Sequence, residues 1–186
     1  NYVDRNTLLA RMQEHIFTVV GRYRGKIGGW DVVNEALNED GTLRDSLWRK
    51  IIGDDYIAKA FEFAHEADPR AELYYNDYGL ENEPKRDGAI KVVKRLQAEG
   101  VTITGVGIQG HYQLDTPSIE TVDQTISAFA KLGVKVMITE LDINVLPSPK
   151  QLQGADVSLR FRSQAGLNPY PNGLPEAVQQ QLAQRY

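Results

Sequence analysis

Apolar positions along the chain follow two different spacings, one typical of buried strands and one typical of helices. Short, almost wholly apolar runs indicate strands of a parallel sheet that is covered on both faces. Such runs predict four strands, at residues 30–34, 73–76, 106–109 and 136–140. Between them, apolar residues recur every three or four positions, which predicts amphipathic helices. The predicted helices span residues 7–23, 43–52, 54–67, 84–99 and a stretch from Thr116 to Gly133.

Polar residues and prolines predict where two of these helices begin. Asp54 is expected to cap the third helix, because an aspartate side chain accepts hydrogen bonds from free N–H groups at a helix start. Thr116 followed by Pro117 predicts the start of the fifth helix, since a polar cap and a proline in the first turn are both favoured there.

The order of elements is one helix followed by four strand–helix units. Such units form either an open doubly wound sheet or a (β/α)8 barrel. Polar residues end each predicted strand: Asn34-Glu35, Asn76-Asp77, Gln109 with His111, and Glu140 with Asp142. In a barrel, the carboxyl ends of all strands converge on one site, whereas an open sheet brings fewer of them together. The sequence therefore predicts an α/β fold that is part of a (β/α)8 TIM barrel.

Composition restricts the classes of function. The chain has 186 residues, no cysteine and a net charge of −4, with 41% hydrophobic residues, which is ordinary for a soluble globular chain. Lys and Arg do not cluster, so no nucleic-acid partner is expected. No apolar run approaches about 18 residues, so no membrane span is expected. Scattered histidines, absent thiolates and the lack of a glycine-rich phosphate loop predict no metal and no cofactor.

Glu35 and Glu140 are the strongest candidates for catalysis. Each follows an apolar strand, where a carboxylate has no packing role. Hydrolysis of a glycosidic bond needs two such groups, because one donates a proton to the leaving oxygen and the other attacks the sugar or activates water. A single glutamate at a strand end would more often cap a helix or pair with an arginine. Two of them, each with polar companions, favour a glycosidase.

Polar neighbours of these glutamates are candidates for supporting roles. Asn34 precedes Glu35, and an amide there can bond a sugar hydroxyl, although alone it would as readily be a turn residue. If the last strand continues, Asp142 points the same way as Glu140. The two carboxylates would then hold His111 in a chain Glu140–His111–Asp142. No loss of activity in Asp142→Ala would disprove this hypothesis.

The aromatic residues divide between the core and the candidate site. We expect Trp48, Tyr74 and Tyr75 in the core, because they lie beside apolar residues within predicted elements. Tyr78 lies past its strand, where an aromatic ring suits the apolar face of a sugar.

Four segments together resemble the signatures of one enzyme family. Residues 30–36 (WDVVNEA) resemble the acid/base signature of family 10 glycoside hydrolases, the endo-β-1,4-xylanases. The next signatures, the last of which carries the nucleophile, are matched in the family's order by residues 73–78 (LYYNDY), 105–111 (GVGIQGH) and 138–142 (ITELD). The resemblance covers residues 7–145 and, more weakly, 175–186.

The resemblance implies a retaining mechanism on a (β/α)8 barrel. Glu35 would be the general acid/base, and Glu140 would be the nucleophile that forms a glycosyl-enzyme intermediate. It also implies substrate-binding roles for Asn34, Asn76, Tyr78, Gln109 and His111, with Asp142 behind them. Asn34 would contact the sugar 2-hydroxyl, and Asn76 and Tyr78 would line the side that binds the leaving sugar. Gln109 and His111 would lie beside the nucleophile.

The same resemblance implies that the chain carries only strands four to seven of the barrel. Residues 1–186 would then form one partial catalytic domain, with a long loop at 147–175 after the nucleophile strand. The missing strands, from the same precursor or another chain, are an expected partner, because uncovered parallel edges favour aggregation. Xylan or xylo-oligosaccharides are the expected substrates, and a carbohydrate-binding module is a candidate neighbour. The polymeric substrate implies a secreted or periplasmic enzyme.

Two rival interpretations stay open. The chain could belong to another retaining barrel glycosidase, such as a β-glucanase, or it could be an inactive, non-catalytic fragment because the barrel is incomplete. An assay on xylan against cellulose, with Glu140→Ala as the control, separates all three.

Overall fold

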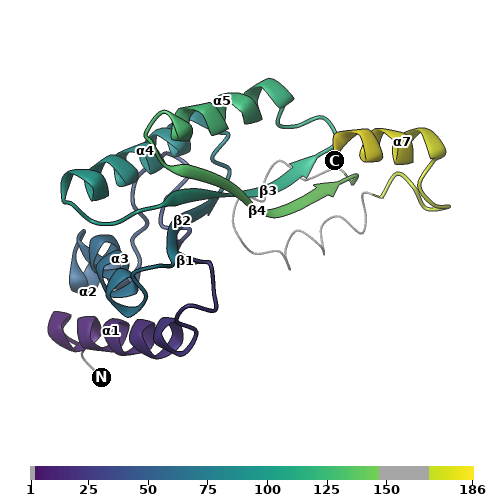
Figure 1. Ribbon diagram of the computed structural model, residues 1–186. Coiled ribbons are helices and arrows are strands. Elements are labelled where there is room, and N and C mark those ends of the chain that lie inside the picture. The colour runs from purple at the N-terminus through teal and green to yellow at the C-terminus, as the bar shows by residue number, and fades with distance from the viewer. Residues whose placement is uncertain (1–2, 147–167) are drawn as a thin grey trace.

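A four-stranded parallel sheet forms the centre of the computed structural model, which describes residues 3–146 and 168–186 (Figure 1). The strands are β1 (Gly29–Asn34), β2 (Glu72–Tyr78), β3 (Gly105–Gln113) and β4 (Lys135–Asn144). Each strand pairs in parallel with the next one along the chain, in the order β1-β2-β3-β4. The helices are α1 (Arg5–Arg22), α2 (Leu47–Ile52), α3 (Tyr56–Ala67), α4 (Glu83–Ala98), α5 (Ile119–Ala130) and α7 (Glu176–Arg185). The predicted alternation of strands and helices is therefore confirmed.

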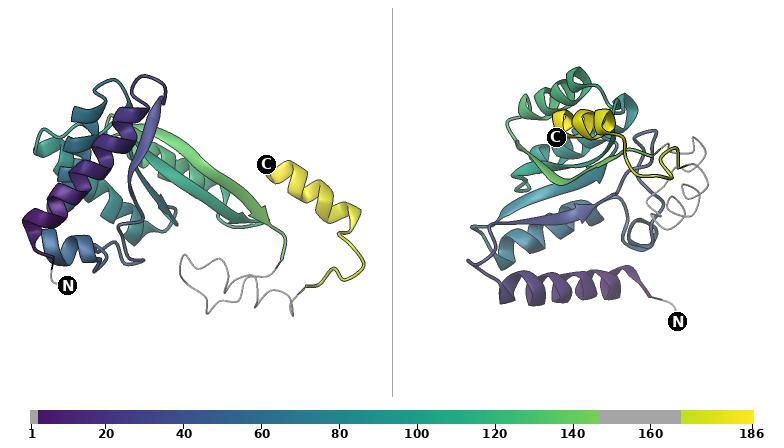
Figure 2. Two further views of the ribbon diagram at one scale, coloured as in Figure 1. Left: turned by 90° about the horizontal axis from the view of Figure 1, so that it is seen from below. Right: turned by 90° about the vertical axis from the view of Figure 1, so that its right-hand side faces the viewer.

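The core lies between the sheet and the helices that cover one of its faces. Helices α1 to α5 gather on that side, and α7 lies apart from them, near the ends of β3 and β4 (Figures 1 and 2). The apolar stripes of α3, α4 and α5 contribute Phe61, Val93 and Phe129, all fully buried. They belong to the same cluster as the equally buried Tyr75 and Ile108 of the sheet. Amphipathic spacing thus sets which face of the sheet is covered.

The other face of the sheet and its two outer edges are open within the described part of the chain. Neither β1 nor β4 has a second neighbouring strand there. The edge strand β4 exposes Met137, Ile138 and Leu141 by 40–50%, which is a large apolar exposure for one strand. This arrangement is that of a barrel segment, and the expectation that further strands cover the edges stays a prediction.

Both predicted helix starts are wrong by a few residues. Asp54 is not a cap; its Oδ1 instead accepts a hydrogen bond from Nε of Arg49 at 2.6 Å. The cap of α5 is Ser118 rather than Thr116, and its Oγ accepts a hydrogen bond from the N–H of Thr121 at 3.2 Å. A cap side chain bonds the amide two or three positions later; Ser118 meets this geometry, whereas Asp55, which precedes α3, makes no such bond.

The aromatic residues predicted in the core behave differently from one another. Tyr74 and Tyr75 are buried, as predicted, whereas Trp48 is 41% exposed. The reason is that α2 begins at Leu47 and has only six residues, which is too short to bury a complete helical face. Residue 43, where this helix was expected to start, lies in the preceding loop.

Most of the loop predicted at 147–175 lies outside the described residues. Residues 168–175 contain neither helix nor strand, and α7 starts directly after Pro175, close to the predicted position. The guanidinium of Arg185 in α7 lies 5.7 Å from the ring centre of Tyr112 on β3 and donates to the carbonyl of Pro117. No described helix combines the length and the apolar character needed to cross a membrane.

Candidate active site

A bulge in β4 decides which side chains of this strand reach the open face of the sheet. Ile108 of β3 pairs with Ile138, but the next residue, Gln109, pairs with Glu140, so Thr139 is an extra residue in β4. A bulge interrupts the strict alternation of side chains. As a result, both Thr139 and its neighbour Glu140 contact residues of the open face.

A second bulge has the same effect in β1. Asp31 pairs with Tyr74 and Val33 with Tyr75, so Val32 is extra, and Asn34 then pairs with Asn76. Without the extra residue, Asn34 would point toward the helices, because side chains alternate between the faces of a strand. The two bulges thus bring polar residues of β1 and β4 to one side.

Glu35 directly follows β1 and has a backbone conformation that residues other than glycine rarely adopt. Its φ is +55°, and no other non-glycine residue of the described chain has a positive φ. This conformation costs about 1–3 kcal/mol and persists only where the surroundings enforce it. Here the N–H of Glu35 donates to the carbonyl of Asn76 at 2.8 Å. Local strain at a carboxylate on a strand end indicates a functional position.

The carboxylate of Glu35 is held between an amide and a guanidinium. Nε2 of Gln109 donates to Oε1 at 3.2 Å, and Nη1 of Arg44 lies 3.9 Å from Oε2. Arg44 is itself fixed by hydrogen bonds to the hydroxyl of Tyr78 at 2.7 Å and to the carbonyl of Leu37 at 2.8 Å. Sequence reasoning missed Arg44, because it lies in a stretch that was assigned to a helix.

His111 connects the second glutamate with Asp142. Its Nε2 lies 3.0 Å from Oε2 of Glu140, and its Nδ1 is hydrogen-bonded to Oδ2 of Asp142. The contacts of the predicted chain Glu140–His111–Asp142 are therefore present. They hold a carboxylate and an imidazole in one fixed arrangement at the ends of β3 and β4.

The three predicted amide residues occupy different places. Asn34 is exposed on the open face, whereas Gln109 is 4% exposed and Asn76 is 2% exposed. The amide of Asn76 bonds only to protein groups among the described residues, namely Asn34 and Thr139. The expectation that Asn76 lines the side of the leaving sugar stays a prediction. The strand β2 continues to Tyr78, so Asn76 lies inside the sheet rather than at its end.

Tyr78 lies above a buried cluster of charges that the sequence did not reveal. Nζ of Lys85 lies 3.3 Å from the centre of the Tyr78 ring, 3.1 Å from Oδ1 of Asp77 and 3.2 Å from Oε1 of Glu39. Lys85 and Asp77 are both fully buried. Burial, together with the carboxylate of Glu39, raises the pKa of Tyr78 to about 12. Burial also raises the pKa of Asp77, although Lys85 and the hydroxyl of Tyr75 oppose it.

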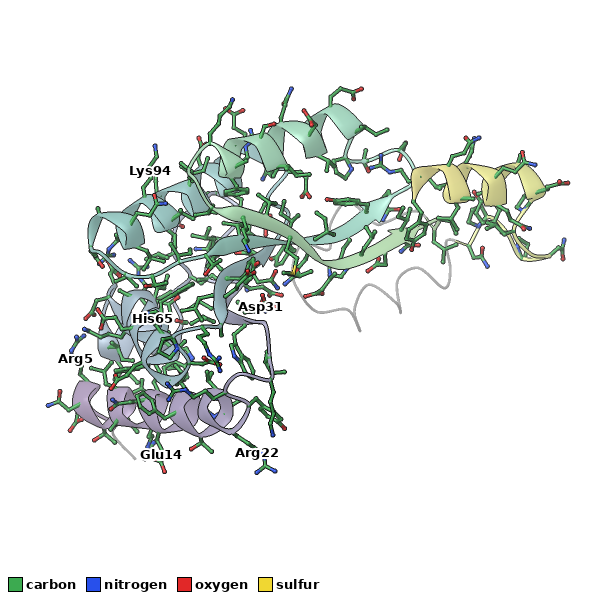
Figure 3. The ribbon with its side chains drawn as sticks, in the orientation of Figure 1. Arg5, Glu14, Arg22, Asp31, His65 and Lys94 are labelled. Atoms are coloured by element: carbon green, nitrogen blue, oxygen red, sulfur yellow. The ribbon has the colours of Figure 1, made fainter. Side chains whose placement is uncertain are left out.

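Asp31 is a further acidic residue on this side that sequence reasoning missed. It lies on β1 (Figure 3), in register with Tyr74 of β2. Burial of its carboxyl group, followed by the negative charge of Glu140, raises the pKa of Asp31. The sequence could have indicated Asp31, because a carboxylate inside an apolar strand has no packing role.

The described residues contain no group of three or more His, Asp or Glu side chains that could hold a metal ion. A cavity of about 200 Å³ lies beside α3 and α4, lined mainly by apolar residues such as Ile57, Val92 and Leu96. None of the candidate site residues lines it. The carboxylates of Glu35 and Glu140 at the strand ends can take part in proton transfer and nucleophilic attack.

Comparisons with known proteins show to which family the chain is related. The chain matches the model of glycosyl hydrolase family 10 over residues 1–184. A solved endoxylanase of this family from a sugarcane soil metagenome is 47% identical, with a TM-score of 0.93, and the match covers 100% of this chain and 54% of that one. Family 10 structures are (β/α)8 barrels, so the parallel sheet of this chain is part of such a barrel, as predicted.

Two further relatives carry names that describe an activity. Endo-1,4-beta-xylanase A from Xylanibacter ruminicola is 50% identical over 184 residues, which cover 99% of this chain and 50% of that protein. Xylanase 10B from Thermotoga petrophila, solved in complex with xylobiose, is 36% identical with a TM-score of 0.76, covering 90% of this chain and 50% of that one. The chain thus spans about half the length of the relatives it matches. On these grounds the chain belongs to glycosyl hydrolase family 10.

Proposed function

We propose that this chain supplies both catalytic carboxylates of a retaining endo-β-1,4-xylanase. The observation that carries the proposal is the pair of anchored glutamates at the carboxyl ends of β1 and β4, the two outer strands of the sheet. Glu35 is held by Gln109 and Arg44, and Glu140 is held by His111. Retaining glycosidases need two carboxylates with separate roles, and different surroundings are how one fold separates them.

In the first step of the proposed mechanism, the carboxylate of Glu140 attacks the anomeric carbon of the sugar. The bond to the glycosidic oxygen breaks, and Glu35 donates its proton to that oxygen. In the second step, Glu35 accepts a proton from water, and the water oxygen attacks the anomeric carbon. The bond to Glu140 breaks, so the sugar leaves with its original configuration.

The neighbouring side chains orient the reacting groups in this mechanism. His111, fixed by Asp142, restricts the rotation of Glu140. In this mechanism the exposed amide of Asn34 bonds the sugar 2-hydroxyl, and Tyr78 contacts the leaving sugar. We propose xylan and xylo-oligosaccharides as substrates because relatives of about 50% identity are named endo-1,4-beta-xylanases. Export from the cytoplasm is expected for an enzyme that acts on a polymer.

Chemical rescue tests the roles of the two glutamates. The variants Glu140→Gly and Glu35→Ala are made in a polypeptide that contains all eight barrel strands, and each is assayed on xylan and cellulose. Azide should restore turnover of an activated aryl xylobioside in both. Azide added to Glu140→Gly should yield the α-glycosyl azide, since the azide takes the place of the nucleophile. Added to Glu35→Ala, it should yield the β-glycosyl azide, since it attacks the glycosyl-enzyme.

The matched control is Glu14→Ala, which removes an exposed glutamate on α1, and it should be fully active (Figure 3). Full activity of Glu140→Gly without azide would disprove the proposal. Preference for cellulose would favour the β-glucanase. The same assay on residues 1–186 alone asks whether the uncompleted barrel segment is an inactive fragment.

A further inference from the structure

A chain of side-chain hydrogen bonds crosses the whole sheet between the two catalytic strands. Oγ1 of Thr139 on β4 donates to Oδ1 of Asn76 on β2 at 2.6 Å. Nδ2 of Asn76 donates to Oδ1 of Asn34 on β1 at 2.9 Å. Nε2 of Gln109 on β3 donates to the same oxygen of Asn34 at 3.1 Å and to Oε1 of Glu35 at 3.2 Å. Every strand of the sheet contributes one residue to this chain.

A glycine in the intervening strand makes the first of these contacts possible. Thr139 and Asn76 belong to strands on either side of β3, and Gly107 lies between them. A Cβ atom at Gly107 would lie 2.3 Å from Oδ1 of Asn76 and 2.7 Å from Cγ2 of Thr139. Because any larger residue would fill this space, the two side chains meet only across a glycine.

Along this series of hydrogen bonds, the position of each donor and acceptor follows from the one before it. The NH2 group of Gln109 has two hydrogens, and both are used, one on Glu35 and one on Asn34. The oxygen of Asn34 is therefore an acceptor, and Asn76 must turn its NH2 group toward it. The oxygen of Asn76 then faces Thr139, which must donate. The hydroxyl of Thr139 also lies 3.3 Å from the carbonyl of Ile108, but its single hydrogen has the shorter contact with Asn76.

We propose that Thr139 and Asn76 are positioning residues that set the orientation of the Asn34 amide. Because its oxygen already receives two hydrogen bonds, Asn34 presents its NH2 group to the bound sugar. This inference rests on the proposed function. An NH2 group donates to the oxygen of the sugar 2-hydroxyl, which leaves the hydroxyl hydrogen free to bond the carboxylate of Glu140. If the amide were reversed, the hydroxyl hydrogen would bond the oxygen of Asn34 and would no longer be available to the carboxylate of Glu140.

The test compares two substrates that differ only in the group that Asn34 is proposed to bond. These are an aryl β-xylobioside and its analogue without the 2-hydroxyl on the sugar that is cleaved. The variant Asn76→Asp has nearly the same shape but no NH2 group to donate. In a polypeptide with all eight barrel strands, we expect it to lower kcat/KM for the parent substrate by about 10- to 100-fold. For the 2-deoxy analogue we expect a change of less than about threefold.

Thr139→Val and Thr139→Ser provide the second measurement, which also decides the outcome if Asn76→Asp does not fold. Valine removes the donor and keeps the branched shape, so it should lower the parent kcat/KM selectively, and serine should restore most of it. Asn6→Asp, an exposed position on α1, is the matched control and should change neither rate.

A merely structural role would lower both rates equally, and this result would overturn the inference while leaving the proposed function intact. No loss with either variant would overturn it as well. Full hydrolysis by Glu140→Gly without azide would instead disprove the proposed function.

Discussion

Replacing Lys85 by methionine is the sharpest test of the buried charge cluster beneath Tyr78. The change keeps an unbranched side chain of similar length and removes the positive charge. Nζ of Lys85 lies 3.1 Å from the buried carboxylate of Asp77 and 3.2 Å from the half-exposed carboxylate of Glu39. Removing the charge therefore leaves Asp77 without its cation at a site that water does not reach.

The size of the effect follows from the distance and the burial. At an effective dielectric constant of about 20, two unit charges 3.1 Å apart attract by about 5 kcal/mol. This attraction offsets the cost of removing both ions from water, which is several kcal/mol for each. In Lys85→Met, Asp77 keeps its desolvation cost and loses the attraction. We expect the free energy of unfolding to fall by about 3–5 kcal/mol at pH 7.

The effect depends on pH in a defined direction. Burial raises the pKa of Asp77 above its ordinary value of 3.8 in the folded protein. A carboxyl group with a raised folded pKa contributes stability that is fully present below its unfolded pKa and is lost as pH rises through the folded pKa. Because Lys85 lowers this pKa, its removal raises it further. The destabilisation should therefore be smaller at pH 4 than at pH 7.

Urea unfolding of the eight-stranded polypeptide at both pH values measures this effect. The double variant Lys85→Met, Asp77→Asn should recover most of the lost stability, because it removes the unpaired charge. Lys59→Met, which breaks the surface pair with Glu62, should cost less than about 1 kcal/mol. The reasoning is refuted if the double variant is no more stable than Lys85→Met, or if the loss is equal at pH 4 and pH 7.

Three further predictions test other parts of the structure. Gly107→Ala should lower the free energy of unfolding by about 1–3 kcal/mol, because its methyl group overlaps two side chains, and urea unfolding checks this. By the same measurement, Ser118→Ala should lower the free energy of unfolding by about 1 kcal/mol, because it removes the cap of α5, and Thr116→Ala should lower it much less. Hydrogen bonds from the Lys135 ammonium and the Tyr74 hydroxyl lower the pKa of Glu72. The contribution of Glu72 to stability is therefore lost as pH falls through this lowered pKa. In Glu72→Gln, the thermal midpoint should vary less between pH about 3 and 5, and an unchanged pH dependence would contradict this assignment.

The pattern of apolar and polar positions was sufficient to predict the four strands, although β2, β3 and β4 continue two to four residues beyond their predicted ends. Each buried strand is a short apolar run because both faces of a parallel sheet are covered in the complete fold. The carboxyl ends of parallel strands lie at the same edge. Glu35, His111, Glu140 and Asp142 could therefore be placed in one site before any distance was known.

The limits of sequence reasoning are clearest at Asn76 and at the two bulges. Asn76 follows an apolar run and was expected at the strand end, but β2 continues two residues further. The bulges at Val32 and Thr139 reverse the alternation of side chains. A bulge depends on the register with the neighbouring strand, and that strand lies about 30 or 40 residues away in the sequence. Neither strand alone contains this information.

The sequence by itself determined the order of strands and helices, the family resemblance and the two candidate glutamates, because these depend on spacing and residue type. The tertiary structure decided the partners of those glutamates. Arg44 lies beside Glu35 in the loop after β1, Lys85 of α4 lies against Glu39 of the same loop, and the hydrogen bonds from Thr139 to Asn34 join β4, β2 and β1. The hydrogen bonds between strands form only after the sheet is paired in register, since polar groups far apart in the chain become neighbours at that stage.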